Sequence, residues 1–185
     1  MAAAFATPPE LEAFLGDSGL EESQAQLTLD VVSDEIREAV GWSVTAESGV
    51  TKTLDGSGLD ELLLPTLRLT SVSEVTENGT LLASDKYLVY ERGSLRRVSS
   101  GWPATWTRKP HGVTVVFDHG YSDDQVPAVF KHVTLETAGR MLDNPTGLLK
   151  SRTVGRVAVT YADIKAQVPP IEDQRLDFYR LPEGF

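Results

Sequence analysis

The residues that could support catalysis or metal binding gather in one short stretch of the chain. Asp118 and His119 are followed by Tyr121, Asp123 and Asp124. Carboxylates and an imidazole bind a metal ion when several of them converge and neighbouring groups orient them. Here all five belong to one turn after a predicted strand, and no partner motif occurs elsewhere in the sequence. We therefore predict that this cluster forms a turn or a helix cap.

Other catalytic motifs do not occur in the sequence. The chain has no cysteine, which excludes disulfides, thiolate zinc sites and a cysteine nucleophile. There is no serine nucleophile elbow, no glycine-rich phosphate loop and no HExxH helix. His111 and His132 stand alone, and we interpret them as packing or surface residues. An enzyme would need carboxylates that converge only in three dimensions, so the sequence favours a protein without catalysis, cofactor or metal.

A second group of residues combines basic and aromatic side chains. Aromatic rings interleaved with arginines can stack on single-stranded bases. Alternatively, the group forms a hairpin whose tryptophans cover the core and whose bases meet the acids of a neighbouring subunit. We favour this second interpretation and predict subunit or partner contacts for Arg92, Arg96, Arg97, Trp102, Trp106, Arg108 and Lys109. A small β-rich module that binds single-stranded nucleic acid or a glycan through Trp102 and Trp106 remains the alternative function.

The charge of the chain is unevenly distributed. The net charge is −10, yet residues 1–64 hold 13 acidic and 2 basic residues, whereas residues 65–185 hold 14 acidic and 15 basic residues. Phosphate chains are bound mainly by lysine and arginine, so an acidic protein binds nucleic acid poorly. An acidic wall beside DNA can still be useful, because it repels the polymer. The simpler explanation is that the acids cover solvated helix faces.

Three helices are predicted from capping residues and apolar periodicity, and they frame the candidate residues. A threonine followed by two prolines starts the first helix, over about 8–15. Apolar residues at spacings of three and four, among them Leu27 and Val31, predict the second over about 21–41. A third helix, over about 126–143, begins near a proline and stops at an Asn-Pro pair.

The residues between the second and third helices have the period of two that is typical of strands. Val113, Val115 and Phe117 alternate with more polar positions, and an Asn-Gly pair at Asn78 predicts a hairpin. These patterns predict a β-rich insert over about 51–118. The expected fold class is therefore α+β: a small helical bundle with an inserted antiparallel β-rich region and an extended C-terminal tail.

The end of the chain mixes charged and aromatic residues and is hard to bury in the same domain. We therefore predict one domain over residues 1–163 and a docking tail over residues 164–185. The tail residues expected to contact a partner are Arg175, Leu176, Phe178, Tyr179, Arg180 and Leu181.

The order of these elements resembles the head–tail connector, or adaptor, proteins of long-tailed bacteriophages. The resemblance covers most of residues 20–163. It is carried, in chain order, by the acidic helix 21–42, the stretches Leu62-Leu63-Leu64-Pro65 and Val72-Ser73-Glu74-Val75, the stretch Gly93-Ser94-Leu95-Arg96-Arg97 before Gly101-Trp102-Pro103, and His119-Gly120-Tyr121 before the helix that opens at Val126-Pro127.

The resemblance implies a structural protein of the virion neck that assembles in the host cytoplasm. Such proteins form a ring, usually of twelve subunits, beneath the portal; the ring extends the DNA channel and supports the next neck or tail-completion protein. Subunits in such a ring meet head to tail, and the chain ends commonly grip the portal protein. No catalysis and no membrane are involved, and genomic DNA passes without sequence-specific binding. We expect channel-lining acids at Glu21, Glu22, Asp30, Asp34, Glu35 and Glu38.

Overall fold

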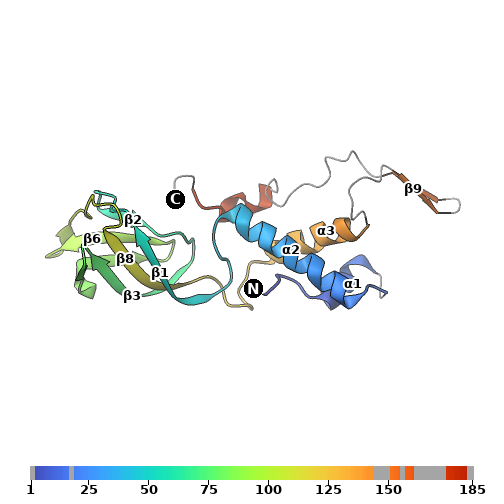
Figure 1. Cartoon of the computed structure of the whole chain (residues 1–185), viewed down its shortest axis with the longest axis horizontal. Helices are drawn as coiled ribbons and strands as arrows, with labels where there is room; N and C mark the ends of the chain where they lie inside the picture. Colours follow the sequence, from blue (N-terminus) through green and yellow to red (C-terminus); the bar gives the residue numbers. More distant parts are fainter. Residues whose placement is uncertain (1–2, 17–18, 144–150, 155–156, 161–173, 183–185) are drawn as a thin grey trace. The chain divides into compact units, whose positions relative to one another are not determined.

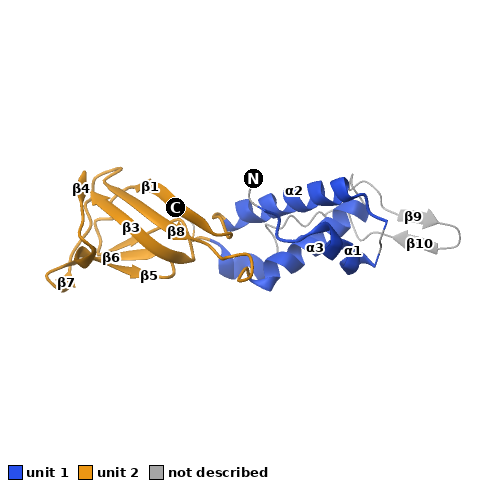
Figure 2. Cartoon of the chain, turned by 90° about the horizontal axis from the view of Figure 1, so that it is seen from below, with its two compact units in different colours: residues 1–40, 127–180 blue, residues 41–126, 181–185 orange. Residues whose placement is uncertain are grey.

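The chain folds into helices and antiparallel sheets, which confirms the predicted α+β class (Figure 1). The computed structural model describes residues 3–16, 19–143, 151–154, 157–160 and 174–182, with the backbone alone for the two segments between 151 and 160. Two compact units are present: residues 1–40 with 127–180 form unit 1, and residues 41–126 with 181–185 form unit 2 (Figure 2). Residues of the predicted domain over 1–163 contribute to both units, and the predicted β-rich insert over 51–118 lies within unit 2.

Unit 1 is a small helical bundle. Its elements are α1 (Pro8–Leu15), α2 (Glu22–Val40), α3 (Ala128–Asp143), a hairpin of β9 (Ser151–Val154) and β10 (Val157–Thr160), and the short 3-10 helix η4 (Gln174–Tyr179). The three α-helices begin and end within two residues of the predicted positions. Their local signals, capping residues and apolar spacing, act within one or two turns of the chain.

The buried face of α2 differs from the stripe that the sequence suggested. Leu29, Val32 and Ile36 are fully buried, whereas Leu27 is 64% exposed and Val31 is 40% exposed. On a helix of 3.6 residues per turn, Leu27 and Val31 lie on the side away from that face. Leu27 and Val31, whose spacing helped to predict the helix, therefore do not belong to its buried face.

A polar contact joins the start of α1 to α3. The Glu10 carboxylate accepts hydrogen bonds from the Thr7 backbone N–H at 2.9 Å and from the Lys131 ammonium at 2.7 Å. The Lys131 and Thr7 hydrogen bonds hold the pKa of Glu10 below its ordinary value. Thr7 and Glu10 form a capping box, so the predicted cap also helps to position α3.

Unit 2 contains two antiparallel sheets. The first has the strand order β1 (Glu47–Leu54), β8 (Val113–His119), β3 (Leu69–Glu77) and β4 (Thr80–Leu81). The second has the order β2 (Glu61–Leu63), β6 (Ser94–Ser99) and β5 (Tyr87–Tyr90), with β7 (Trp102–Pro103) paired to β6 and the 3-10 helix η1 (Ser84–Lys86) before β5. All these pairs are antiparallel.

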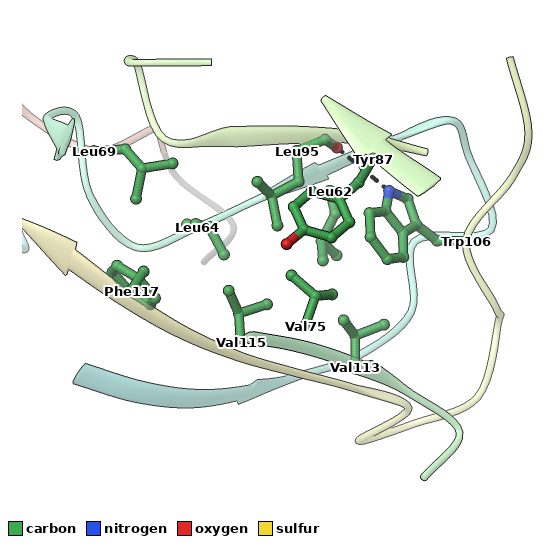
Figure 3. Close-up of a cluster of buried hydrophobic side chains, with 10 residues drawn as sticks. All are labelled: Leu62, Leu64, Leu69, Val75, Tyr87, Leu95, Trp106, Val113, Val115 and Phe117. Carbon is green, nitrogen blue, oxygen red and sulfur yellow. Dashed lines mark hydrogen bonds between the residues drawn. The ribbon is translucent and has the colours of Figure 1, made fainter. Parts of the chain in front are cut away.

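The core of unit 2 is formed by side chains from both sheets. Strand β8 alternates as predicted, with Val113, Val115 and Phe117 buried. Figure 3 shows these side chains facing Leu95 of the second sheet and Trp106 of the segment between β7 and β8. An alternating strand with one face on a core is what a period of two predicts.

Two glycines of unit 2 have a left-handed backbone for different reasons. Asn78 and Gly79, at φ 53° and 81°, form the turn between β3 and β4, which confirms the predicted Asn-Gly hairpin. Gly93 has a similar φ of 82°, but a Cβ added there would lie 1.9 Å from the carbonyl oxygen of Thr66. A Cβ added at Gly79 would have no atom within 4 Å.

We expect Gly93→Ala to destabilise unit 2 more than Gly79→Ala does. Both variants place an L side chain in the left-handed region, at a cost of about 1–2 kcal/mol. Only Gly93→Ala also forces a backbone clash, which adds about 1–3 kcal/mol. Urea unfolding followed by tryptophan fluorescence measures the difference, because all 3 tryptophans lie in unit 2. Equal losses in the two variants would contradict the close approach of Thr66.

Candidate interaction surfaces

The carboxylate at the centre of the predicted turn cluster connects strands. Asp118 accepts hydrogen bonds from the Gly49 backbone N–H at 2.8 Å and from the Ser71 hydroxyl at 2.7 Å, which lower the pKa of Asp118 below its ordinary value. Asp118 thus links β8 to a strand on each side. Asp123 and Asp124 are exposed. No group of three or more histidine, cysteine, aspartate or glutamate residues that could hold a metal ion occurs in the part of the chain that the structure describes.

The histidine of the same cluster belongs to the packed end of β8. His119 is buried, and its ring centroid lies 5.3 Å from that of Phe117 and 6.4 Å from that of Trp42. Burial lowers the pKa of the His119 imidazole below its ordinary value, although the Glu47 carboxylate, 3.9 Å from Nε2, opposes this shift. The neutral imidazole is therefore the form that the folded unit favours.

We expect unit 2 to lose stability as the pH falls from about 7.5 to about 5.5. In this interval His119 binds a proton more readily in the unfolded chain, because its pKa is lower in the folded unit. The unfolded state then holds more protons, so the free energy of unfolding falls with the pH. Urea midpoints from tryptophan fluorescence give the slope, and His119→Gln should flatten it. A slope unchanged in that variant would contradict the assignment to His119.

Trp106 lies in the core of unit 2, in contrast to the prediction that it contacts a partner. Its side chain is 2% exposed, and the indole Nε1–H donates to the backbone oxygen of Leu95 at 3.3 Å. A ring enclosed in this way cannot stack on a base or meet a neighbouring subunit. Trp106 is therefore a core residue, in agreement with the part of the favoured interpretation in which the tryptophans of the hairpin cover the core.

Arg97 is also held within unit 2. Its guanidinium pairs with Glu77 at 3.1 Å, where the two side chains are 15% and 12% exposed, and lies 5.7 Å from the Trp106 ring centroid. The Glu77 carboxylate also accepts the backbone N–H of Thr107 at 2.7 Å. These contacts connect β3 to β6 and to the segment after β7, so the predicted partner contact is corrected for Arg97 too.

The other members of the basic and aromatic group lie on the surface of unit 2. Trp102 is 76% exposed on the short strand β7, opposite Ser99. The Arg96 side chain is 45% exposed and pairs with Asp60 at 3.2 Å. The exposed members are Arg92, Arg96, Trp102, Arg108 and Lys109. The structure thus separates the two tryptophans, one to the surface and one to the core.

The acids of α2 lie away from the buried face of that helix. Asp34 is exposed and pairs with Arg37 at 2.8 Å, and the amide of Gln26 donates to half-buried Asp30 at 2.9 Å. The other predicted channel-lining residues, Glu21, Glu22, Glu35 and Glu38, are exposed. Leu27 lies among these acids, and this exposed leucine is a feature that the sequence interpretation missed.

The described part of the C-terminal tail packs on unit 1. Leu176 is fully buried, the Tyr179 ring lies 5.0 Å from that of Phe130, and Arg175 pairs with Glu136 at 2.8 Å. The expectation of a tail that is extended throughout is therefore wrong for the segment that includes η4, because its apolar residues complete the helical core. Phe178, in contrast, is 71% exposed. The other predicted tail residues, Arg180 and Leu181, are half-buried, and residues 164–173 lie outside the described residues.

Exposed apolar side chains also gather on the sheet formed by β2, β6 and β5. Leu63, Leu88 and Tyr90 are between 43% and 49% exposed. These residues lie in the predicted β-rich insert over about 51–118, for which the sequence indicated no contact on this face. The sequence does contain a signal for this exposed surface. Strand β5 is apolar at all its positions, whereas a strand with only one buried face needs apolar residues at alternate positions.

Helices long and apolar enough to cross a bilayer are not found among the residues that the structure describes.

Comparison with known proteins gives similarity of fold. No protein-family profile matches the chain, and no curated protein matches it. A chain in the neck of an empty gene transfer agent (GTA) particle, computed with C6 symmetry, is 17% identical with a TM-score of 0.59, over 100% of this chain and 95% of that one. A chain in the virion of a native GTA particle is 17% identical with a TM-score of 0.55, over the same shares. At this identity the likeness shows a shared fold.

Proposed function

We propose that this chain is a structural protein of a virion neck: a head-to-tail adaptor that forms a ring beneath the portal. The observation that carries the proposal is the fold similarity to a chain from a GTA neck, which extends over 100% of this chain and 95% of that chain. A likeness of this extent includes both units. The proposed role is assembly without catalysis: the ring, of twelve copies, extends the DNA channel and supports the next neck or tail-completion protein.

The acids of α2 suit a channel that DNA must traverse without adhesion. Six acids and one base, Arg37, lie between residues 21 and 40. Five of the acids are exposed and Asp30 is half-buried, so their charges reach the solvent. Like charges repel the phosphate chain and prevent the counterion release that drives binding to DNA. We propose that part of this acidic surface lines the channel and that DNA is not read by sequence.

Phe178 is the tail residue best placed to anchor the ring to the portal protein. It is 71% exposed and lies two residues after the buried Leu176. An aromatic side chain on an ordered segment can insert into a partner at a small cost in conformational entropy. The exposed bases of unit 2 are proposed to contact neighbouring copies.

Light scattering tests the proposal directly. The mass of the protein is measured alone and then mixed with the portal protein encoded by the same genome. We expect a monomer of 20.2 kDa alone and a closed multimer on the portal. A protein that keeps its monomer mass in the mixture would contradict an adaptor role.

Phe178→Ala separates portal binding from folding in the same assay. We expect the variant to keep the helical circular dichroism of the wild type and to bind the portal about 30-fold more weakly, the effect of losing a hot-spot residue. Unchanged portal binding would remove Phe178 from the contact.

A binding module for single-stranded nucleic acid or a glycan is the second candidate function. The exposure of Trp102, with the exposed Arg96 on the paired strand, favours it. Trp106, the second ring that it required, is buried. Salt-sensitive binding of an oligonucleotide that is lost in Trp102→Ala would support this function, and absence of oligonucleotide binding would remove its nucleic-acid form.

A further inference from the structure

The outer face of α2 is not purely acidic. Leu27 is 64% exposed and Val31, one turn further, is 40% exposed. Glu38 lies on the same side of the helix, two turns beyond Val31, and is exposed. An exposed leucine carries no charge and so adds nothing to the repulsion of DNA by this surface. Apolar side chains surrounded by charged ones are typical of protein–protein contacts.

The segment 92–109, which contains the hairpin of β6 and β7, has the opposite character. It holds five basic residues and no acidic residue, and all of these bases except Arg97, which pairs with Glu77, are exposed. The turn between the strands is a tight pair of left-handed residues, Ser100 at φ 51° and Gly101 at φ 82°, and the following Trp102 is 76% exposed. Tryptophan and arginine are the residues that most often dominate binding energy in interfaces.

We propose that these two surfaces bind each other between neighbouring copies of the chain. Trp102 of one copy packs on Leu27 and Val31 of the next, and the exposed bases Arg92, Arg96, Arg108 and Lys109 meet the acids of α2. This proposal rests on the proposed ring, because a head-to-tail contact joins two different surfaces and repeats around the ring. Charge complementarity indicates that a second copy of the chain covers the outer face of α2, because α2 supplies the acids and residues 92–109 supply the bases. The acids outside this contact remain available to the channel.

Two matched leucines test the helix side of the contact. Leu27 and Leu81 are both 64% exposed, in unit 1 and unit 2 respectively. We expect Leu27→Lys to weaken formation of the closed ring on the portal about 30-fold, with wild-type helical circular dichroism. Leu81→Lys should assemble like the wild type. A Leu27→Lys protein that assembles like the wild type would overturn the proposal.

Photo-cross-linking identifies what covers α2. Because the chain has no cysteine, Gln24→Cys carries one benzophenone, one turn before Leu27. This variant is mixed with ¹⁵N-labelled wild-type protein and assembled on the portal. We expect adducts on ¹⁵N-labelled peptides from residues 92–109. Adducts on the portal protein, on other peptides of the chain, or none at all would overturn the proposal.

The controls separate this proposal from the proposed function. If wild-type protein does not assemble on the portal, the adaptor role fails. If the wild type assembles but the cross-links lie elsewhere, only the contact between α2 and the β6–β7 hairpin fails.

Discussion

Replacing Trp106 with alanine is expected to lower the free energy of unfolding of unit 2 by about 3–5 kcal/mol, the usual loss for a buried aromatic residue. The side chain is 2% exposed and packs in the core with Leu95 and Val113. Its truncation leaves a cavity and also removes the hydrogen bond from the indole N–H to the Leu95 oxygen. In addition, Arg97 loses the ring that its guanidinium faces at 5.7 Å.

Trp102→Ala is the matched control, because the same side chain is removed from the surface. Trp102 is 76% exposed, so we expect a change within about 0.5 kcal/mol. Urea unfolding followed by the fluorescence of the two tryptophans that each variant keeps measures unit 2 alone, because all 3 tryptophans of the chain lie in that unit. If the two variants lose similar amounts of unfolding free energy, the assignment of Trp106 to the core and Trp102 to the surface is contradicted.

Leu176→Ala is expected to destabilise unit 1 by about 2–5 kcal/mol. Leu176 is fully buried, although it lies in a segment that the sequence assigned to a docking tail. Removal of its side chain leaves a cavity in the helical core, and η4, which Tyr179 and Arg175 also hold on α3, loses its buried anchor. A deletion of the whole tail would therefore disturb folding and binding together.

Phe178→Ala, two residues away, is the control for Leu176→Ala. Because Phe178 is 71% exposed, we expect little change in stability. Far-UV circular dichroism follows the helices of unit 1, while tryptophan fluorescence should report an unchanged unit 2. If Leu176→Ala unfolds at the same urea concentration as Phe178→Ala, η4 does not belong to the core of unit 1.

Local patterns determined the elements of this protein. The helix predicted over 8–15 has the same bounds in the structure, and β8 alternates as Val113, Val115 and Phe117 predicted. The Asn-Gly turn after β3 also occurs as expected. Each of these signals depends on residues within a few positions, where backbone sterics, capping and side-chain period act. They could be derived without knowing what each element packs against.

Tertiary packing decided which side chains serve the core and which stay on the surface. The sequence pattern treated Trp102 and Trp106 alike and included Leu27 in the apolar spacing of its helix, yet Trp106 is buried and the other two are exposed. It also left Leu176 in a free tail. Burial depends on which distant segment covers a residue, and no local pattern contains that information. Local patterns therefore determined the three α-helices, strand β8 and the β3–β4 turn, whereas the docking of η4 and the surfaces available for assembly were decided only by tertiary packing.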